Sequence, residues 1–210
     1  MTRRKIKKEL KAALLALSAD RSLGYLAVTA KPELPVRDRV AWYFQRRHPD
    51  LIAAREYTIQ SEKNSKSRRK VDLVLLRKAS PGPCPFALVE FKEVIAPPLD
   101  NPEHPLMASL KRDLKRLANV SRVPRFGVML MVRVENPEQL EQRGLDDDVV
   151  KYMRKFRRWA KEPDGPKKAI ANVQRFFNST NHKVSRPLTI ELESPWAARV
   201  KLISFILEPR

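Results

Sequence analysis

Two apolar segments that contain charged residues decide how this chain folds. They are Val71-Asp72-Leu73-Val74-Leu75-Leu76 and Phe86-Ala87-Leu88-Val89-Glu90-Phe91-Lys92-Glu93. Segments this apolar predict buried strands, in which a charged side chain is costly unless it meets a partner or a metal ion. Because side chains alternate along a strand, Glu90 and Lys92 should share one face. If the two strands are neighbours, Asp72 converges with them.

Two carboxylates and an amine around one point suit a Mg²⁺-dependent hydrolase of phosphodiester bonds. Mg²⁺ takes oxygen ligands and keeps several waters, so Asp72 and Glu90 would be enough to hold it. The ion would polarise the phosphate and lower the pKa of a bound water. Lys92 would orient the attacking water and neutralise charge in the transition state. The open alternative is a structural ion-pair cluster at a sheet edge, or solvent exposure of Glu90 and Lys92.

Composition limits the class of protein and of partner. The 210 residues, 42% of them hydrophobic, predict a single globular domain spanning 1–210. The 43 basic residues against 24 acidic ones give a net charge of +19, so a polyanionic partner is expected, and nucleic acid is the commonest. Charge alone does not separate DNA from RNA, or an enzyme from a passive binder.

Cysteine, histidine and apolar patterning exclude other classes. The single cysteine cannot form an internal disulfide, and three scattered histidines argue against a structural zinc site. The N-terminal segment 3–18 has the pattern of a basic amphipathic helix, and no stretch is long and apolar enough to predict a membrane span. The expected location is therefore cytoplasmic.

The order of predicted elements points to a mixed sheet. Helices are expected at 36–47 and 107–120, and strands at 55–60, 71–76, 86–92 and 126–134. A strand-helix-strand crossover of this kind predicts a parallel pair within an α/β sheet. A C-terminal extension, 147–207, should hold helices at 147–161 and 164–177 and strands at 188–193 and 199–207.

The chain resembles the PD-(D/E)xK nuclease superfamily, in which an Asp on one strand is followed by Glu-x-Lys on the next. Here the pattern is Asp72 and then Glu90-Phe91-Lys92, with 17 residues between the two carboxylates. The resemblance covers about 36–134 and implies a restriction-endonuclease-like αβββαβ core, a mixed central sheet flanked by helices. The residue before Asp72 is Val71 rather than proline, a position that varies in the superfamily.

The resemblance also implies further site residues. The backbone carbonyl of Phe91 would be another metal ligand. An additional catalytic carboxylate would come from the first helix or the first strand, where Asp38 and Glu56 are the candidates and Glu56 is preferred. The implied activity is that of a Mg²⁺-dependent endodeoxyribonuclease, with Mn²⁺ able to substitute.

Three basic surfaces are candidates for binding phosphates. They are the connection 63–70, the helix 107–120 and the segment 151–161. The residues singled out are Lys66, Arg68, Arg69, Lys70, Lys111, Arg112 and Lys115. The aromatic run Trp42-Tyr43-Phe44 is expected in the core instead.

Three functional hypotheses remain open from the residues. The first is a nuclease that acts on DNA, as a homodimer or as a subunit of a larger nucleic-acid-processing complex, with no membrane partner. The second is a non-catalytic nucleic-acid-binding or assembly subunit that keeps the fold. The third is an RNA-binding or RNA-cleaving protein.

Overall fold

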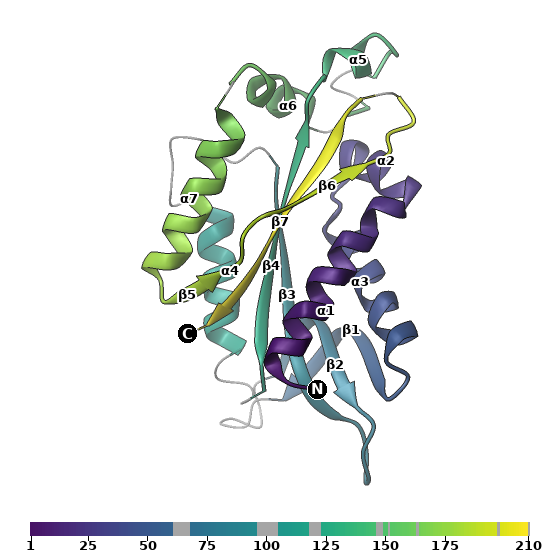
Figure 1. The fold of residues 1–210 in the computed structure, drawn as a ribbon, viewed down its shortest axis with the longest axis vertical. Helices are drawn as coiled ribbons and strands as arrows, with labels where there is room; N and C mark the ends of the chain where they lie inside the picture. Colours follow the sequence, from purple (N-terminus) through teal and green to yellow (C-terminus); the bar gives the residue numbers. More distant parts are fainter. Residues whose placement is uncertain are drawn as a thin grey trace.

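Helices flank both faces of a seven-stranded mixed sheet (Figure 1). The computed structural model describes residues 1–60, 68–95, 105–117, 123–145, 149–150, 152–162, 164–196 and 198–209. The predicted class, α/β with a mixed central sheet and flanking helices, is confirmed at this level.

The sheet combines an antiparallel meander with one parallel pair. Its strands are β1 (Leu51–Gln60), β2 (Arg68–Arg77), β3 (Cys84–Ile95), β4 (Arg125–Val134), β5 (His182–Val184), β6 (Leu188–Leu192) and β7 (Val200–Pro209). Their order is β1-β2-β3-β4-β7-β5, and β6 also pairs with β7. Only β3 and β4 run parallel among the described pairs, joined through a helix, so the predicted crossover is confirmed.

Two groups of helices cover the sheet from opposite sides (Figure 1). The helices are α1 (Arg3–Leu15), the 3₁₀ turn η1 (Ala16–Ala19), α2 (Arg21–Thr29), α3 (Glu33–Arg47), α4 (Pro105–Leu117), α5 (Glu138–Glu141), α6 (Met153–Ala160) and α7 (Gly165–Ser179). The first three helices pack on the face that buries Phe44 and Phe91. Helices α4 and α7 pack on the other face, around Leu110 and Phe205.

Helix boundaries differ most from prediction near the N-terminus. The expected helix 3–18 ends at Leu15 and continues as a 3₁₀ turn. Helix α2 was not predicted; it starts where the Asp20 side chain accepts a hydrogen bond from the Ser22 N–H at 2.9 Å. Helix α3 begins at Glu33 rather than Val36, because Pro32 occupies its cap position and the helix accommodates a proline in its first turn.

The C-terminal extension also differs in detail. The helix expected to start at 147 begins at Met153, and Val149, which precedes it, is 47% exposed. Positions 147, 148 and 151 lie outside the described residues. Strand β5 and helix α5, of three and four residues, were not predicted because so few residues carry no periodic signal.

Helix α2 rests directly on the backbone that follows β6. A Cβ atom added at Gly24 would lie 1.8 Å from the carbonyl oxygen of Glu193, so the two backbones would have to separate. We expect Gly24→Ala to lower the free energy of unfolding by about 3 kcal/mol, measured by urea denaturation.

Gly82→Ala provides the matched control for that substitution. A Cβ at Gly82 has no heavy atom within 4 Å among the described residues, so a change within about 0.5 kcal/mol is expected. Equal unfolding midpoints for the Gly24 and Gly82 variants would contradict the close approach of α2.

Candidate active site

The hydrogen-bonded ladder between β2 and β3 stops at the predicted site. In the described pairing it runs from Arg77 opposite Cys84 to Leu73 opposite Val89. Beyond that point β3 pairs with β4, while β2 pairs with β1. Asp72 and Glu90 are the next residues on each strand, so they occupy the position where the two strands part.

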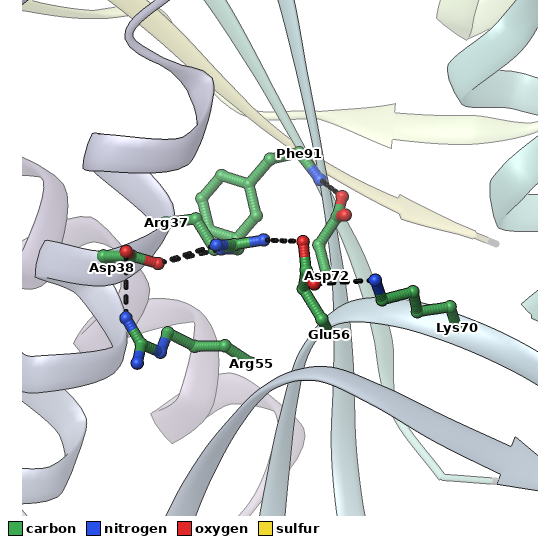
Figure 2. A network of polar contacts seen from close by, with 7 residues as sticks. All are labelled: Arg37, Asp38, Arg55, Glu56, Lys70, Asp72 and Phe91. Carbon is green, nitrogen blue, oxygen red and sulfur yellow. Dashed lines mark hydrogen bonds and ion pairs between the residues drawn. The ribbon is translucent and has the colours of Figure 1, made fainter.

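A side chain bridges the strands at this position. The backbone N–H of Phe91 donates to Oδ2 of Asp72 at 2.8 Å (Figure 2). The Asp72 carboxylate is also hydrogen-bonded to the carboxyl group of Glu90. The structure therefore brings the two predicted metal ligands into direct contact across neighbouring strands.

The electrostatics of this pair are unusual for two carboxyl groups. Glu90 is 8% exposed. Burial, followed by the negative charge of Asp72 and the hydrogen bond between them, raises the pKa of Glu90 to about 9. At neutral pH and without a cation, Glu90 is consequently protonated, and its carboxyl O–H donates a hydrogen bond to the Asp72 carboxylate.

Lys92 and Asp113 lie beside the carboxyl pair. The Nζ atom of Lys92 is 3.7 Å from Oδ2 of Asp113 on α4. The charge of Asp113 raises the pKa of Glu90 further, and the charge of Lys92 opposes the rise. The predicted alternation along β3 agrees with this placement, because the Phe91 ring is fully buried in the core on the α1–α3 side.

Helix α4 can approach the sheet closely at this level because Gly127 stands opposite Glu90 on β4. A Cβ at Gly127 would lie 3.1 Å from Leu114 and 3.4 Å from Leu110, two members of the apolar stripe of α4. With this stripe against the sheet, Asp113 of the same helix faces β3. The missing side chain on β4 thus helps to position the charged groups of α4.

A small cavity opens beside Glu90. Its volume is about 240 Å³, room for about eight waters at ~30 Å³ each. The lining residues are Arg69, Lys70, Glu90, Asp113, Arg116 and Leu117. Three basic side chains at the wall of a cavity that reaches a buried carboxyl group suit a phosphate next to a cation.

The third carboxylate predicted for the site, Glu56 or Asp38, is held in an ion-pair network (Figure 2). The guanidinium of Arg37, 8% exposed, contacts Asp38 at 2.9 Å and Glu56 at 3.2 Å. Asp38 also pairs with Arg55 at 2.9 Å, and Glu56 pairs with Lys70 at 2.7 Å. Each carboxylate lies between two cations, and Lys70 followed by Arg37 lowers the pKa of Glu56.

The backbone at Glu56 is irregular. Its φ is 49°, in the left-handed region that a glutamate rarely adopts. The residues on either side, Arg55 and Tyr57, pair regularly with Leu73 and Val71. Glu56 therefore stands directly across from Asp72, and its side chain is held by cations rather than by the carboxyl pair.

Glu33 is a carboxylate near the pair that the sequence did not suggest. Its Oε2 accepts from the Glu93 N–H at 3.1 Å, and the Glu33 N–H faces a carboxylate oxygen of Glu93 at 3.4 Å. Burial raises the pKa of Glu33; the charge of Lys92 opposes the rise and that of Asp72 adds to it. Glu33 was missed because the helix was expected to begin at 36; an acidic residue directly after Pro32 is a helix-start signal that could have found it.

The predicted phosphate-binding residues are partly near the cavity. Arg69 and Lys70 line it, and Arg68 is exposed at the start of β2. Lys66 lies outside the described residues. Lys111, Arg112 and Lys115 are exposed on α4, and Nζ of Lys111 stacks 5.8 Å from the centroid of the Phe176 ring.

Comparison with known proteins adds no relative from which a role could be transferred. No protein-family model, curated protein or solved structure matches the chain. Within the described residues no group of three or more His, Cys, Asp and Glu side chains forms a metal site. None of the described helices combines the length and apolarity needed to cross a membrane.

Proposed function

We propose that this protein is a metal-dependent nuclease that hydrolyses phosphodiester bonds of DNA, built on a restriction-endonuclease-like core of the PD-(D/E)xK type. The observation that carries the proposal is the hydrogen-bonded pair of the buried Glu90 and the half-buried Asp72 beside Lys92. The element order α3-β1-β2-β3-α4-β4 supports the proposed core.

The residues fit a hard divalent cation. Two carboxyl groups in contact repel each other when both are ionised, and Glu90 is buried, so the pair is stabilised by either a shared proton or a bound cation. Mg²⁺ and Mn²⁺ prefer carboxylate and water oxygens, and two protein carboxylates are a common set for Mg²⁺. Asp72 and Glu90 would hold the ion, and the Phe91 carbonyl remains the further ligand that the resemblance implies.

The remaining charged groups have distinct tasks in this proposal. A divalent cation in such a site neutralises charge on the phosphate and makes water more acidic. Lys92 lies on the same face of β3 as Glu90. In this proposal it stabilises negative charge that develops on the phosphate and orients the attacking water. Arg69, Lys70 and Arg116 line the adjoining cavity and would bind neighbouring phosphates, giving affinity without sequence recognition.

The direct test is cleavage of DNA by the purified protein. With Mg²⁺ or Mn²⁺ we expect supercoiled plasmid to be nicked or linearised, and EDTA to abolish the reaction because it removes the divalent cation. An Asp72→Ala protein purified in parallel controls for a contaminating nuclease.

Two outcomes would count against the proposal. Binding of DNA that EDTA leaves unchanged, with no cleavage by any divalent ion, would favour the non-catalytic nucleic-acid-binding subunit. Cleavage of RNA but not of single-stranded or duplex DNA, in a parallel competition, would replace the proposed substrate.

A further inference from the structure

Trp42 is the most exposed large apolar side chain among the described residues. It is 61% exposed, although the run Trp42-Tyr43-Phe44 was expected in the core. That expectation is correct for Phe44, which is fully buried, and wrong for Trp42. Tyr43 is half-buried, with its hydroxyl 3.3 Å from Glu9. Successive residues of α3 point 100° apart, so a run of three aromatics cannot all face the sheet.

Trp42 lines a groove on the outer side of α3. The groove has a volume of about 970 Å³, in the range of small-molecule sites. It is formed by the end of α1, η1, the start of α2 and the exposed face of α3. Apart from Trp42, Tyr43 and Leu17, its apolar lining is alanine: Ala13, Ala16 and Ala19.

Four arginines line the groove together with Trp42, against a single aspartate. Arg39 is held by an ion pair with Asp20. Arg47 contacts Glu9 at 3.3 Å, and its guanidinium lies 5.9 Å from the centroid of the Tyr43 ring. Both guanidinium groups are thereby positioned before any ligand arrives.

Arg21 and Arg46 complete the positive rim. Arg21 pairs with Glu193 at 3.2 Å, and both side chains are largely exposed, so the pair contributes little. The side chain of Arg46 makes no hydrogen bond or ion pair with any residue in the described ranges. It lies one helical turn beyond Trp42, so its guanidinium can reach a ligand stacked on the indole.

We propose that this groove binds an unpaired segment of single-stranded nucleic acid, with a base stacked on Trp42 and the adjacent phosphates on Arg46 and Arg47. A nucleotide combines a planar aromatic face with a negative charge, which is the combination that an exposed indole within a ring of arginines complements. Such binding requires neither the Asp72–Glu90 pair nor a metal ion.

The groove fits a nucleic acid better than an acidic protein. At a protein–protein hot spot a tryptophan is surrounded by contacts that exclude water, whereas here charged side chains surround Trp42. The groove also lies on the helix that carries Glu33 near the candidate active site. Trp42 stands nine helical steps beyond Glu33, a rise of about 14 Å, which matches the rise of about four stacked nucleotides.

Tryptophan fluorescence offers a readout that is independent of cleavage. The chain has three tryptophans. Trp159 is 3% exposed, and Trp196 packs against Tyr25 with ring centroids 5.3 Å apart. Titration of the protein with an oligothymidylate in EDTA should therefore quench mainly Trp42, and a Trp196→Phe variant should retain the quenching.

Substitutions separate stacking from charge. Trp42→Ala should weaken oligothymidylate binding about 5- to 150-fold, the loss expected for one stacked base, while Trp42→Phe should retain most of the affinity. Arg46→Ala should reduce the slope of log affinity against log salt by about 0.7. Arg143→Ala, which removes an exposed arginine beyond α5, is the matched control and should lower affinity less than Arg46→Ala.

Several results would overturn the proposal. They are wild-type affinity in a folded Trp42→Ala protein, equal loss in the Arg46 and Arg143 variants, or quenching by polyglutamate that exceeds quenching by oligothymidylate. The last result would assign the groove to an acidic protein partner. Binding to the groove is measured in EDTA and does not depend on cleavage. Absence of cleavage would therefore refute the proposed nuclease activity without affecting the test of the groove.

Discussion

Glu90→Gln should lower the rate of DNA cleavage by about 10³-fold or more, and leave the metal-free protein at least as stable as the wild type. The pKa of Glu90 is about 9, so the metal-free carboxyl group is protonated at neutral pH and an amide resembles it. A cation needs the carboxylate instead, and glutamine offers one neutral oxygen. Loss of metal-assisted charge stabilisation is worth several kcal/mol, which gives the expected rate effect.

The same group determines how stability depends on pH. The pKa of Glu90 is raised from 4.5 to about 9, so the folded metal-free protein keeps a proton that the unfolded chain releases. The stabilisation is full below about pH 4.5 and is lost as pH rises toward 9, with a slope of at most about 1.4 kcal/mol per pH unit. Glu90→Gln should remove this slope.

Urea denaturation across that pH range, in EDTA, measures the effect. With Mg²⁺ added at alkaline pH, the wild type should gain thermal stability and Glu90→Gln should not. Glu191→Gln on β6 is the matched control, since that glutamate is 81% exposed and should behave as wild type. Identical pH profiles for wild type and Glu90→Gln would refute the raised pKa of Glu90, and wild-type cleavage by the variant would refute its metal-binding role.

Lys92→Ala should lower cleavage about 10²- to 10³-fold, the typical cost of removing one well-placed electrostatic contact in a transition state. Its ammonium group lies near both Asp113 and the Asp72–Glu90 pair. Because it is not a metal ligand, the thermal stabilisation by Mg²⁺ should persist. The measurement is therefore a cleavage rate together with a metal-dependent melting temperature.

Lys183→Ala, on the exposed side of β5, removes the same charge away from the carboxyl pair and is the control. Its cleavage rate should stay close to that of the wild type. Full activity of Lys92→Ala would end the proposed catalytic role of the lysine, even if metal binding at Asp72 and Glu90 were demonstrated.

Local patterns were enough to predict the central strands. The apolar runs 71–76, 86–92 and 126–134 lie inside β2, β3 and β4. Strands buried on both faces are continuous apolar segments, and this signal depends on no distant residue. The parallel β3–β4 pair followed from the helix between them.

Local patterns failed where an element depends on its neighbours. Helix α2 has nine residues with a glycine inside, a weak sequence signal, and forms where Gly24 can approach the backbone of Glu193. Trp42 looked like a core aromatic because it stands beside Phe44, but helix geometry turns it outward. Length and composition do not show where a helix meets a distant backbone segment or which side of a helix faces solvent.

The sequence by itself determined which residue types could form a site: Asp72, Glu90 and Lys92 on buried strands, where charge is costly. The tertiary structure alone decided that β2 and β3 part between Asp72 and Glu90, that α4 contributes Asp113 and α3 contributes Glu33, and that Glu56 is held by Arg37 and Lys70. The physical reason is the distance along the chain over which each effect acts. Strand formation follows from hydrophobic patterns over a few neighbouring residues, whereas the electrostatics of a site depend on distances between side chains that are far apart in the chain.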